Sequence, residues 1–301
     1  MGAFDSADLL GRVQKTLDGF VADHEPALLA MGEELAPMTD AVAQFLSGGK
    51  RLRPRFCFWG HLGAGGQDSD EIVQAAAALE LFQACAIIHD DVMDGSDTRR
   101  GRPAVHRRFA ALHASEGWEG SADVFGNGAA ILLGDLCLAW ADELLMSCGI
   151  VNPEARRVFD AMRAELMAGQ YLDLLEQVRG HSTVESALRV ARFKSAKYTI
   201  VEPLHLGGCL ASASPEVLAT YTAYGMPLGE AFQLRDDVLG VFGDPSVTGK
   251  PAGDDLREGK RTALVAMALS TATPVKRFVQ LIFQKVRKKL HKPFVPASVF
   301  L

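Results

Sequence analysis

The chain has 301 residues, of which 48% are hydrophobic, and its formal net charge at pH 7 is −6. This apolar fraction is large enough to bury a sizeable core, whereas the negative charge argues against general nucleic-acid binding. The N-terminus lacks the layout of a signal peptide, and no uncharged apolar run is long enough to span a bilayer, so we expect a cytoplasmic protein.

Cysteine usage points to the same compartment. The five cysteines are scattered without the CxxC spacing of redox or zinc sites. We therefore expect small buried hydrophobic residues in a reducing environment at Cys57, Cys85, Cys137, Cys148 and Cys209.

Apolar residues recur with helical periodicity along most of the chain. This periodicity predicts helices over 6–20, 26–45, 71–93, 128–147, 153–178, 183–210, 215–242 and 262–271. The segment 95–103 is predicted to be a polar loop. No stretch alternates as strands do, so the predicted fold is all-α. No linker interrupts the chain, and we expect one domain over 1–273 followed by an atypical basic segment, 274–301.

Two acidic clusters lie at the ends of predicted helices. Asp90 and Asp94 are four residues apart and share a helix face, with Asp91 beside them. The second cluster begins with Asp236 and Asp237. Carboxylates packed this densely repel one another unless cations neutralise them, and oxygen ligands of this kind suit magnesium. The sequence therefore predicts two carboxylate walls that bind cations and a polyphosphate.

Basic residues gather near both clusters. The run 48–54, Gly-Gly-Lys-Arg-Leu-Arg-Pro, places Lys50 and Arg53 three apart at a helix start, where both can reach one anion. Arg99 and Arg100 follow the first cluster, and Lys194 lies within a predicted helix. A solvated basic turn would be the simpler interpretation of any one group. Their combination with two acidic clusters favours phosphate binding.

These motifs together resemble those of trans-isoprenyl diphosphate synthases. The matching strings are GGKRLRP (48–54), HDDVMDGSDTRRGRP (89–103), GQYLDL (169–174), KSAKYT (194–199), FQLRDDVLGVFGD (232–244), and GK followed by GKRTAL (249–250 and 259–264). Their order and spacing match the family from about residue 41 to 268. The resemblance implies an all-α, single-domain helical bundle of the isoprenoid-synthase type around a central cavity.

The resemblance also implies a reaction, cofactors and partners. The expected reaction is the head-to-tail condensation of isopentenyl diphosphate with an allylic diphosphate, through magnesium-assisted ionisation to an allylic cation. About three Mg²⁺ ions are expected in each active site of a homodimer. Ionisation would depend on Asp90, Asp91, Asp94, Asp236 and Lys194.

Roles can be carried over to individual residues. Asp90, Asp94 and Asp236 would bind the metal, and metal-bound waters would be oriented by Asp91, Asp173, Asp237 and Asp254, with Gln170 lining the site. The diphosphate of isopentenyl diphosphate would be held by Lys50, Arg53, Gln83 and Arg100. The allylic diphosphate would be held by Arg99, Lys194, Lys250 and Lys260, with Ser195 and Gln233 nearby.

The second acidic cluster departs from the family pattern, because Gly240 stands where many relatives have a third Asp. This change would weaken metal binding at that wall. Asp236 and Asp237 remain, and Asp244 lies one turn on, so we expect activity to survive.

Product length is expected to depend on the floor below the first cluster. Ala86 and Cys85, four and five residues before Asp90, are both small, and Phe82 lies about one turn deeper. A floor at Phe82 predicts a product longer than fifteen carbons, and we expect the twenty-carbon geranylgeranyl diphosphate. A farnesyl or longer product stays open, because Phe82 could face the core and leave Leu132 or Leu133 to close the pocket.

The last 28 residues carry seven Lys or Arg and no Asp or Glu. One interpretation is a truncated or frame-shifted end, which the abrupt change in composition favours. The other is an amphipathic basic helix that contacts a membrane surface.

Three other functions are compatible with parts of the pattern. A class I terpene cyclase also ionises a diphosphate, but it does not need a second diphosphate site such as Lys50 and Arg53. A non-catalytic subunit of a heteromeric prenyl synthase typically loses its acidic clusters. An inactive protein would result if the atypical C-terminus removed helices that the site or the dimer requires.

Overall fold

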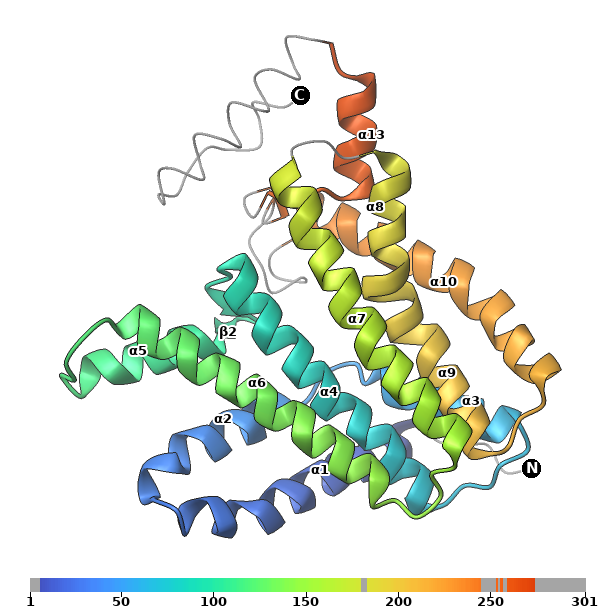
Figure 1. Ribbon diagram of the computed structural model, residues 1–301, viewed down its shortest axis with the longest axis horizontal. Helices are drawn as coiled ribbons and strands as arrows, with labels where there is room; N and C mark the ends of the chain where they lie inside the picture. Colours follow the sequence, from blue (N-terminus) through green and yellow to red (C-terminus); the bar gives the residue numbers. More distant parts are fainter. Residues whose placement is uncertain (1–5, 180–182, 245–252, 254, 257–258, 274–301) are drawn as a thin grey trace.

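Helices form nearly all the regular structure in the computed structural model, which describes residues 6–179, 183–244, 253, 255–256 and 259–273 (Figure 1). The elements in chain order are α1 (Ser6–Leu29), η1 (Glu33–Leu35), α2 (Ala36–Leu46), α3 (Leu52–Gly63), α4 (Asp70–Asp94), β1 (Thr98–Arg99), β2 (Arg102–Pro103), α5 (Val105–Ser115), α6 (Ala122–Met146), α7 (Pro153–Arg179), α8 (Val184–Ala191), η2 (Arg192–Val201), α9 (Glu202–Leu210), α10 (Pro215–Phe242) and α13 (Ala263–Thr271). Within these ranges the only strands are β1 and β2, which have two residues each and pair antiparallel. The predicted all-α class is confirmed.

The core is organised around α4. This helix contacts α6, α3, α1, α2, α5 and α9, and its four consecutive alanines, 75–78, are fully buried. Small side chains let the neighbouring helices approach closely from several sides. Gly95, in a left-handed conformation with φ 66°, ends α4 directly after Asp94. The first acidic cluster therefore occupies the last turn of a long helix with a largely buried core side.

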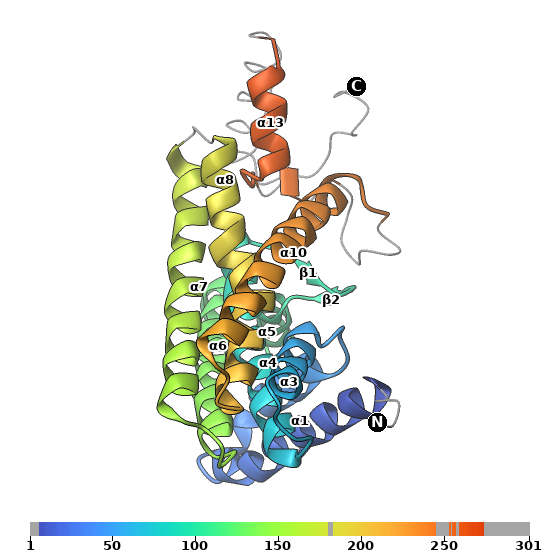
Figure 2. The same cartoon turned by 90° about the vertical axis from the view of Figure 1, so that its right-hand side faces the viewer.

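The second half of the chain packs α7, η2, α9 and α10 along one another (Figures 1 and 2). The segment η2 is π-helical, and glycines of its two neighbours let their backbones come close to it. A Cβ on Gly169 of α7 would lie 2.9 Å from the Lys194 nitrogen, and one on Gly229 of α10 would lie 2.5 Å from the Ala196 Cα. Lys194 is thus fixed by backbone contact on both sides of η2.

Several predicted boundaries differ from the structure. The predicted break at Pro26 is wrong, because α1 continues to Leu29 while its buried stripe, Leu9, Val13, Leu17 and Val21, packs against the core. The predicted helix 183–210 is three consecutive segments, α8, η2 and α9. The predicted loop 95–103 contains the β1–β2 ribbon, and α5 is an additional helix.

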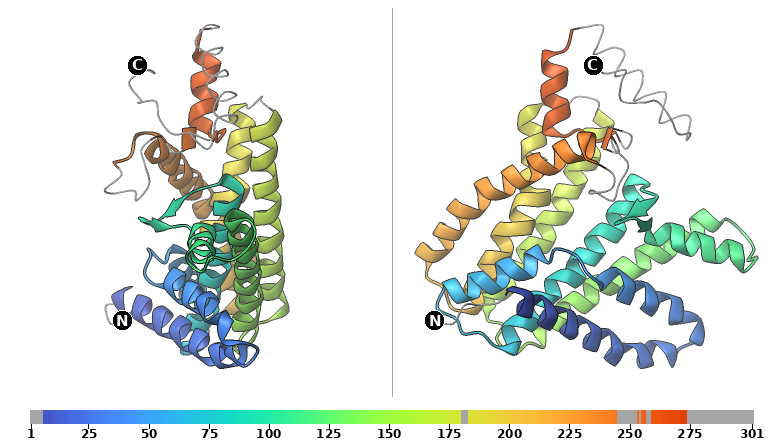
Figure 3. Two further views of the ribbon diagram at one scale, coloured as in Figure 1. Left: turned by 90° about the vertical axis from the view of Figure 1, so that its left-hand side faces the viewer. Right: turned by 180° about the vertical axis from the view of Figure 1, so that it is seen from behind.

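Two helices, α4 and α6, are long and apolar enough to cross a membrane by length and composition alone. In α4, 72% of the apolar window is buried inside the protein, as expected of a core helix, but in α6 the share is 39%. The α5–α6 hairpin projects from the rest of the fold (Figures 1 and 3).

Candidate active site

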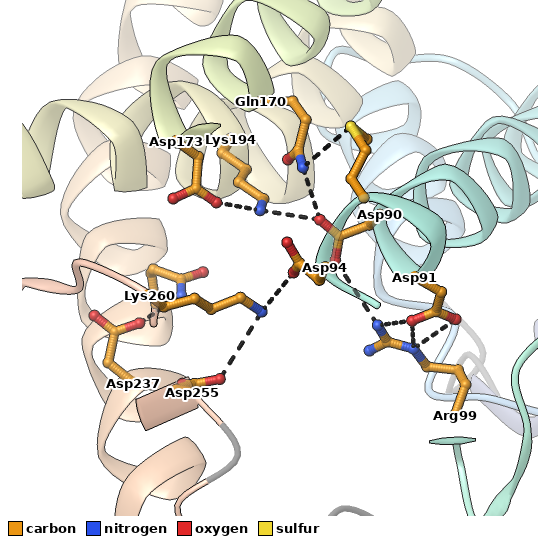
Figure 4. A network of polar contacts seen from close by, with 12 residues as sticks. Asp90, Asp91, Asp94, Arg99, Gln170, Asp173, Lys194, Asp237, Asp255 and Lys260 are labelled. Atoms are coloured by element: carbon orange, nitrogen blue, oxygen red, sulfur yellow. Dashed lines mark hydrogen bonds and ion pairs between the residues drawn. The ribbon is translucent and has the colours of Figure 1, made fainter. Parts of the chain in front are cut away.

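The last turn of α4 meets α7 and η2 at Asp90 (Figure 4). Asp90 Oδ1 accepts from Gln170 Nε2 at 2.9 Å and from Lys194 Nζ at 3.1 Å. Lys194 Nζ also donates to Asp173 Oδ2 at 2.6 Å. Burial alone would raise the pKa of Asp90, but Lys194, Lys260 and Arg99 outweigh it and lower the pKa to about 2. Asp90 is therefore an ionised acceptor at any physiological pH.

Asp91 is held differently from Asp90. Its side chain is almost fully buried, and it accepts from Arg99 Nε at 2.9 Å and from Arg99 Nη2. Arg99 Nη2 lies 3.8 Å from Asp90 Oδ2. Asp91 thus fixes the arginine beside the partly buried carboxylate of Asp90.

Lys260 connects the C-terminal part of the described chain to the first cluster. Its Nζ lies 3.0 Å from Asp94 Oδ2 and 3.9 Å from Asp255 Oδ1. Figure 4 shows the lysine extending between the two carboxylates. Residues more than 160 positions apart in sequence therefore share one charged contact.

The second cluster is carried by α10. Asp237 is buried and accepts from Gln233 Nε2 at 2.7 Å. Burial raises its pKa to about 6; Gln233 and Lys260 oppose this shift, and Asp255 and Asp236 add to it. Asp236 is exposed as a residue, but desolvation of its carboxylate by neighbouring atoms raises its pKa. Lys50 opposes this shift, and Asp255 adds to it. Within the described residues, the nearby lysines do not outweigh the burial of these two carboxylates, in contrast to Asp90 at the first wall.

Asp255 is a site residue that the sequence interpretation missed. A Cβ on Gly240 would overlap the carboxylate of Asp255, so the aspartate occupies the space that a side chain at 240 would take. The signal for it is the acidic pair 254–255, which lies between two Gly-Lys motifs. The family motif points to Asp254, the other member of this pair. Asp254 and Lys250 lie outside the described residues.

Two of the residues expected at the second diphosphate, Arg53 and Gln83, contact Tyr198 of η2. The guanidinium carbon of Arg53 sits 4.0 Å from the centre of the Tyr198 ring, and Arg53 Nη2 donates to Thr199 Oγ1 at 2.8 Å. Tyr198 Oη donates to Gln83 Oε1 at 2.5 Å. Arg53 and Gln83, from α3 and α4, are thus fixed by neighbouring residues of η2.

Arg100 completes this basic side. It lies against Gly49, where a Cβ would be 3.4 Å from Arg100 Nη2. Burial lowers the pKa of Arg100; Glu80 opposes this, and Arg51, Arg99 and Arg53 add to it. Several guanidinium groups therefore raise the local positive potential, which an anion would relieve.

The proposed chain-length residues face in different directions. Phe82 is fully buried and packs edge-on against Phe159 and Tyr198, at centroid distances of 5.9 and 5.4 Å. Cys85 instead lies 3.8 Å from His89 Nδ1, toward α6. Ala86 is partly buried. Of the two alternative floor residues, Leu132 is exposed and Leu133 is buried.

The donor set suits magnesium, although no group of three or more acidic, His or Cys side chains in the described ranges is close enough to hold a metal. The lysines explain this, since Lys194 and Lys260 contact the carboxylates of Asp90 and Asp94. Magnesium typically takes only one or two protein carboxylates and completes its shell with water and phosphate oxygens. Asp90 and Asp94 on α4 and Asp236 on α10 fit that requirement.

Comparison with known proteins identifies the family of the chain. A family model described as polyprenyl synthetase matches residues 36–293. Geranylgeranyl diphosphate synthase of Mycobacterium tuberculosis is 35% identical over 79% of this chain and 63% of its own length. Geranylfarnesyl diphosphate synthase of Aeropyrum pernix is 34% identical over 75% of this chain and 68% of its own. The chain therefore spans roughly two thirds of the length of these relatives.

A solved structure gives the same result. Geranylgeranyl pyrophosphate synthase from Corynebacterium glutamicum, complexed with isoprenyl diphosphate and magnesium, superposes with a TM-score of 0.83. It is 41% identical, and the match covers 95% of this chain and 88% of that one. With most of its length matched by the family model and the expected motifs gathered at one place, the chain belongs to the polyprenyl synthetase family.

Proposed function

We propose that the protein is a prenyltransferase that condenses isopentenyl diphosphate head to tail with an allylic diphosphate. The observation that carries this proposal is the contact of two α4 carboxylates, Asp90 and Asp94, with Lys194 and Lys260, where Lys260 also acts electrostatically on Asp237 of α10. A separate basic side at Arg53 and Arg100 supports a second diphosphate.

The allylic diphosphate binds between the two walls. Lys194, Lys260 and Arg99 place positive charge where the leaving group accumulates negative charge as the C–O bond breaks. Asp90, Asp94 and Asp236 would hold about three magnesium ions, which supply further neutralisation of that charge. Asp173 and Asp91 keep Lys194 and Arg99 in position through their ion pairs.

Isopentenyl diphosphate binds on the basic side. Lys50, Arg53 and Arg100 hold its diphosphate, and Gln83, fixed by Tyr198, contributes an amide. In the reaction, the allylic C–O bond breaks with its electron pair going to the diphosphate, and the double bond of isopentenyl diphosphate attacks the allylic cation. A proton then leaves for the released diphosphate, and a new double bond forms. Positioning and electrostatics carry this mechanism, and it needs no protein nucleophile.

The product is the twenty-carbon geranylgeranyl diphosphate. Small residues at Ala86 and Cys85 and the aromatic group at Phe82, Phe159 and Tyr198 support a floor about two turns below Asp90. The names of the relatives, geranylgeranyl and geranylfarnesyl diphosphate synthases, are consistent with this range. A farnesyl or longer product is the alternative.

The assembly is a homodimer joined through α6. This helix exposes three large apolar residues, Val124, Ile131 and Leu132. An apolar surface of this kind on so apolar a helix favours burial against a second protein chain. A cytoplasmic location fits the cysteines, all of which are free and buried. We place the catalytic domain over 1–273; the basic segment 274–301 lies outside the described residues.

The direct test is incubation of the purified full chain with isopentenyl diphosphate, magnesium and each allylic primer, followed by sizing of the products. Elongation is expected, and Asp90→Asn should lower turnover by about a hundredfold or more because the ionised acceptor is lost. Asp40→Asn on α2, exposed and outside the site, is the matched control.

Each alternative has its own outcome in this assay. Cyclic products from an allylic substrate alone would indicate a terpene cyclase, and activity that requires an added partner chain would indicate a non-catalytic subunit. Absence of elongation with every primer would contradict the proposal.

A further inference from the structure

Arg51 is the one residue of the run Lys50-Arg51-Leu52-Arg53 whose charged side chain turns into the core. It is 5% exposed, whereas Lys50 is exposed to solvent. Its backbone is left-handed, with φ 49° and ψ 43°, immediately before α3 begins. A residue with a Cβ adopts this conformation only at an energetic cost, so the surrounding contacts must hold it there.

The contacts of Arg51 join three helices to the loop. Arg51 Nη1 donates to Glu80 Oε2 of α4 at 2.5 Å, and Nη2 donates to Gln14 Oε1 of α1 at 2.5 Å. Nη2 also donates to the Leu46 carbonyl at the end of α2. Glu80 is as buried as the arginine. The guanidinium therefore fixes the loop relative to α1, α2 and α4 at once.

A buried pair of this kind is poor evidence for stability, because removing two charges from water offsets most of their attraction. What the pair does provide is a fixed geometry. Both the buried charge and the left-handed backbone lie at the loop that carries Lys50 and Arg53. The placement indicates a role in function rather than in stability.

The surroundings of the pair identify that role. Glu80 and Gln83 lie three apart on α4 and share a face of the helix. Arg53, two residues after Arg51, reaches Tyr198 and Thr199, and Arg100 lies against Gly49. Every residue proposed to hold the diphosphate of isopentenyl diphosphate is thus within a few positions of the pair, or in contact with its loop.

We propose that Arg51 and Glu80 form a positioning pair that sets the isopentenyl diphosphate site without touching the substrate. This inference rests on the proposed prenyltransferase function. Arg51 holds the loop so that Lys50 and Arg53 face the substrate side, and Glu80 ties that loop to the helix that carries Gln83. The allylic site, built on the far end of α4 and on α7, η2 and α10, does not depend on the pair.

The test compares steady-state constants of Arg51→Gln, Glu80→Gln and the exposed control Lys15→Gln in the full chain. The first two variants should raise the KM for isopentenyl diphosphate by about tenfold or more, with the KM for the allylic primer and kcat within about threefold of the parent. Lys15→Gln should change none of these constants. Allylic hydrolysis without isopentenyl diphosphate should stay at the parental rate.

Equal increases in both KM values, or a lowered Tm with an unchanged KM for isopentenyl diphosphate, would overturn the positioning role. If Arg51→Gln does not fold, Arg51→Lys carries the same expectation, since it keeps the charge but cannot make all the contacts of the fork. Failure of the proposed function itself gives a different result, because the parent protein would then neither elongate nor hydrolyse any allylic diphosphate.

Discussion

Gly240 matters for the side chain that it lacks. In the sequence, the absence of a third aspartate at this position suggested a weaker second wall. In the structure, the carboxylate of Asp255 lies over Gly240 and within 3.9 Å of Lys260. A residue fifteen positions later thus supplies the third carboxylate at this wall. Its contact with Gly240 results from the tertiary fold and cannot be inferred from local spacing.

Gly240→Ala should lower turnover, because the new methyl group displaces the Asp255 carboxylate. A double-mutant cycle with Asp255→Ala measures the link. The double variant should be no slower than Asp255→Ala alone, since the displaced group is already gone. Additive losses in kcat would show that the glycine and the aspartate act independently.

The raised pKa of Asp237 gives the metal-free protein a distinctive pH dependence. The unfolded chain loses this proton near the ordinary aspartate value of about 3.9, so between that pH and about 6 the native protein binds more protons and the contribution of Asp237 to stability falls as pH rises. The depressed pKa of Asp90 acts in the opposite sense, and its contribution is lost only as pH falls toward 2.

The free energy of unfolding of Asp237→Asn, relative to that of the parent, should therefore rise by roughly 1–3 kcal/mol as the pH rises from 4 to 7. Urea unfolding without magnesium measures this difference. Asp40→Asn, at an exposed position of α2, serves as the control and should keep a constant offset from the parent. A constant offset for Asp237→Asn as well would contradict the raised pKa.

Among the secondary-structure elements, η2 is one that local sequence could not predict. Its helical pattern is continuous from 183 to 210, and nothing in it marks a change to π-helical geometry. The register depends on two glycines in other helices, Gly169 and Gly229, whose approach to η2 is a tertiary contact. Such π-helical turns often coincide with functional sites, and this one carries Lys194.

Gly229→Ala should destabilise the protein by about 1–3 kcal/mol, because its methyl group would meet the η2 backbone at Ala196. Gly11→Ala on α1 is the matched control, since a Cβ there has no neighbour within 4 Å. That substitution should be neutral or stabilising, by up to about 1 kcal/mol. Denaturant unfolding measures the free energy of unfolding of both variants. Equal changes would contradict the close contact between Gly229 and the η2 backbone.

The sequence predicted the elements that have strong local signals. The bounds of α4, α7 and α10 agree within two residues, because long apolar patterns and flanking Ser, Gly or Pro define them. The acidic clusters and Lys194 were selected from motif spacing and lie together. The sequence could not distinguish the role of Arg51 from those of Lys50 and Arg53, since only tertiary packing decides which of these charged side chains is buried.

For the whole molecule, the apolar face of α6 predicts an oligomer. Leu132→Glu should weaken the proposed homodimer by about tenfold or more, because it places a charge in the apolar contact. Leu132 is 62% exposed and Val178 on α7 is 73% exposed, so Val178→Glu is a matched control expected to leave the dimer intact. Sedimentation velocity distinguishes the species, and a monomeric parent would contradict the assembly.

The two lysines of the site have a consequence for the thermodynamics of substrate binding. Lys194 and Lys260 already contact Asp90 and Asp94, so the arrival of a magnesium–diphosphate complex exchanges one set of ion pairs for another. Few counterions are released in such an exchange. The KM for the allylic substrate should therefore change less with ionic strength than the KM for isopentenyl diphosphate, whose basic side has fewer carboxylate partners. Steady-state assays between low and moderate salt measure the two slopes, and equal slopes would show that the lysines act as ordinary exposed charges.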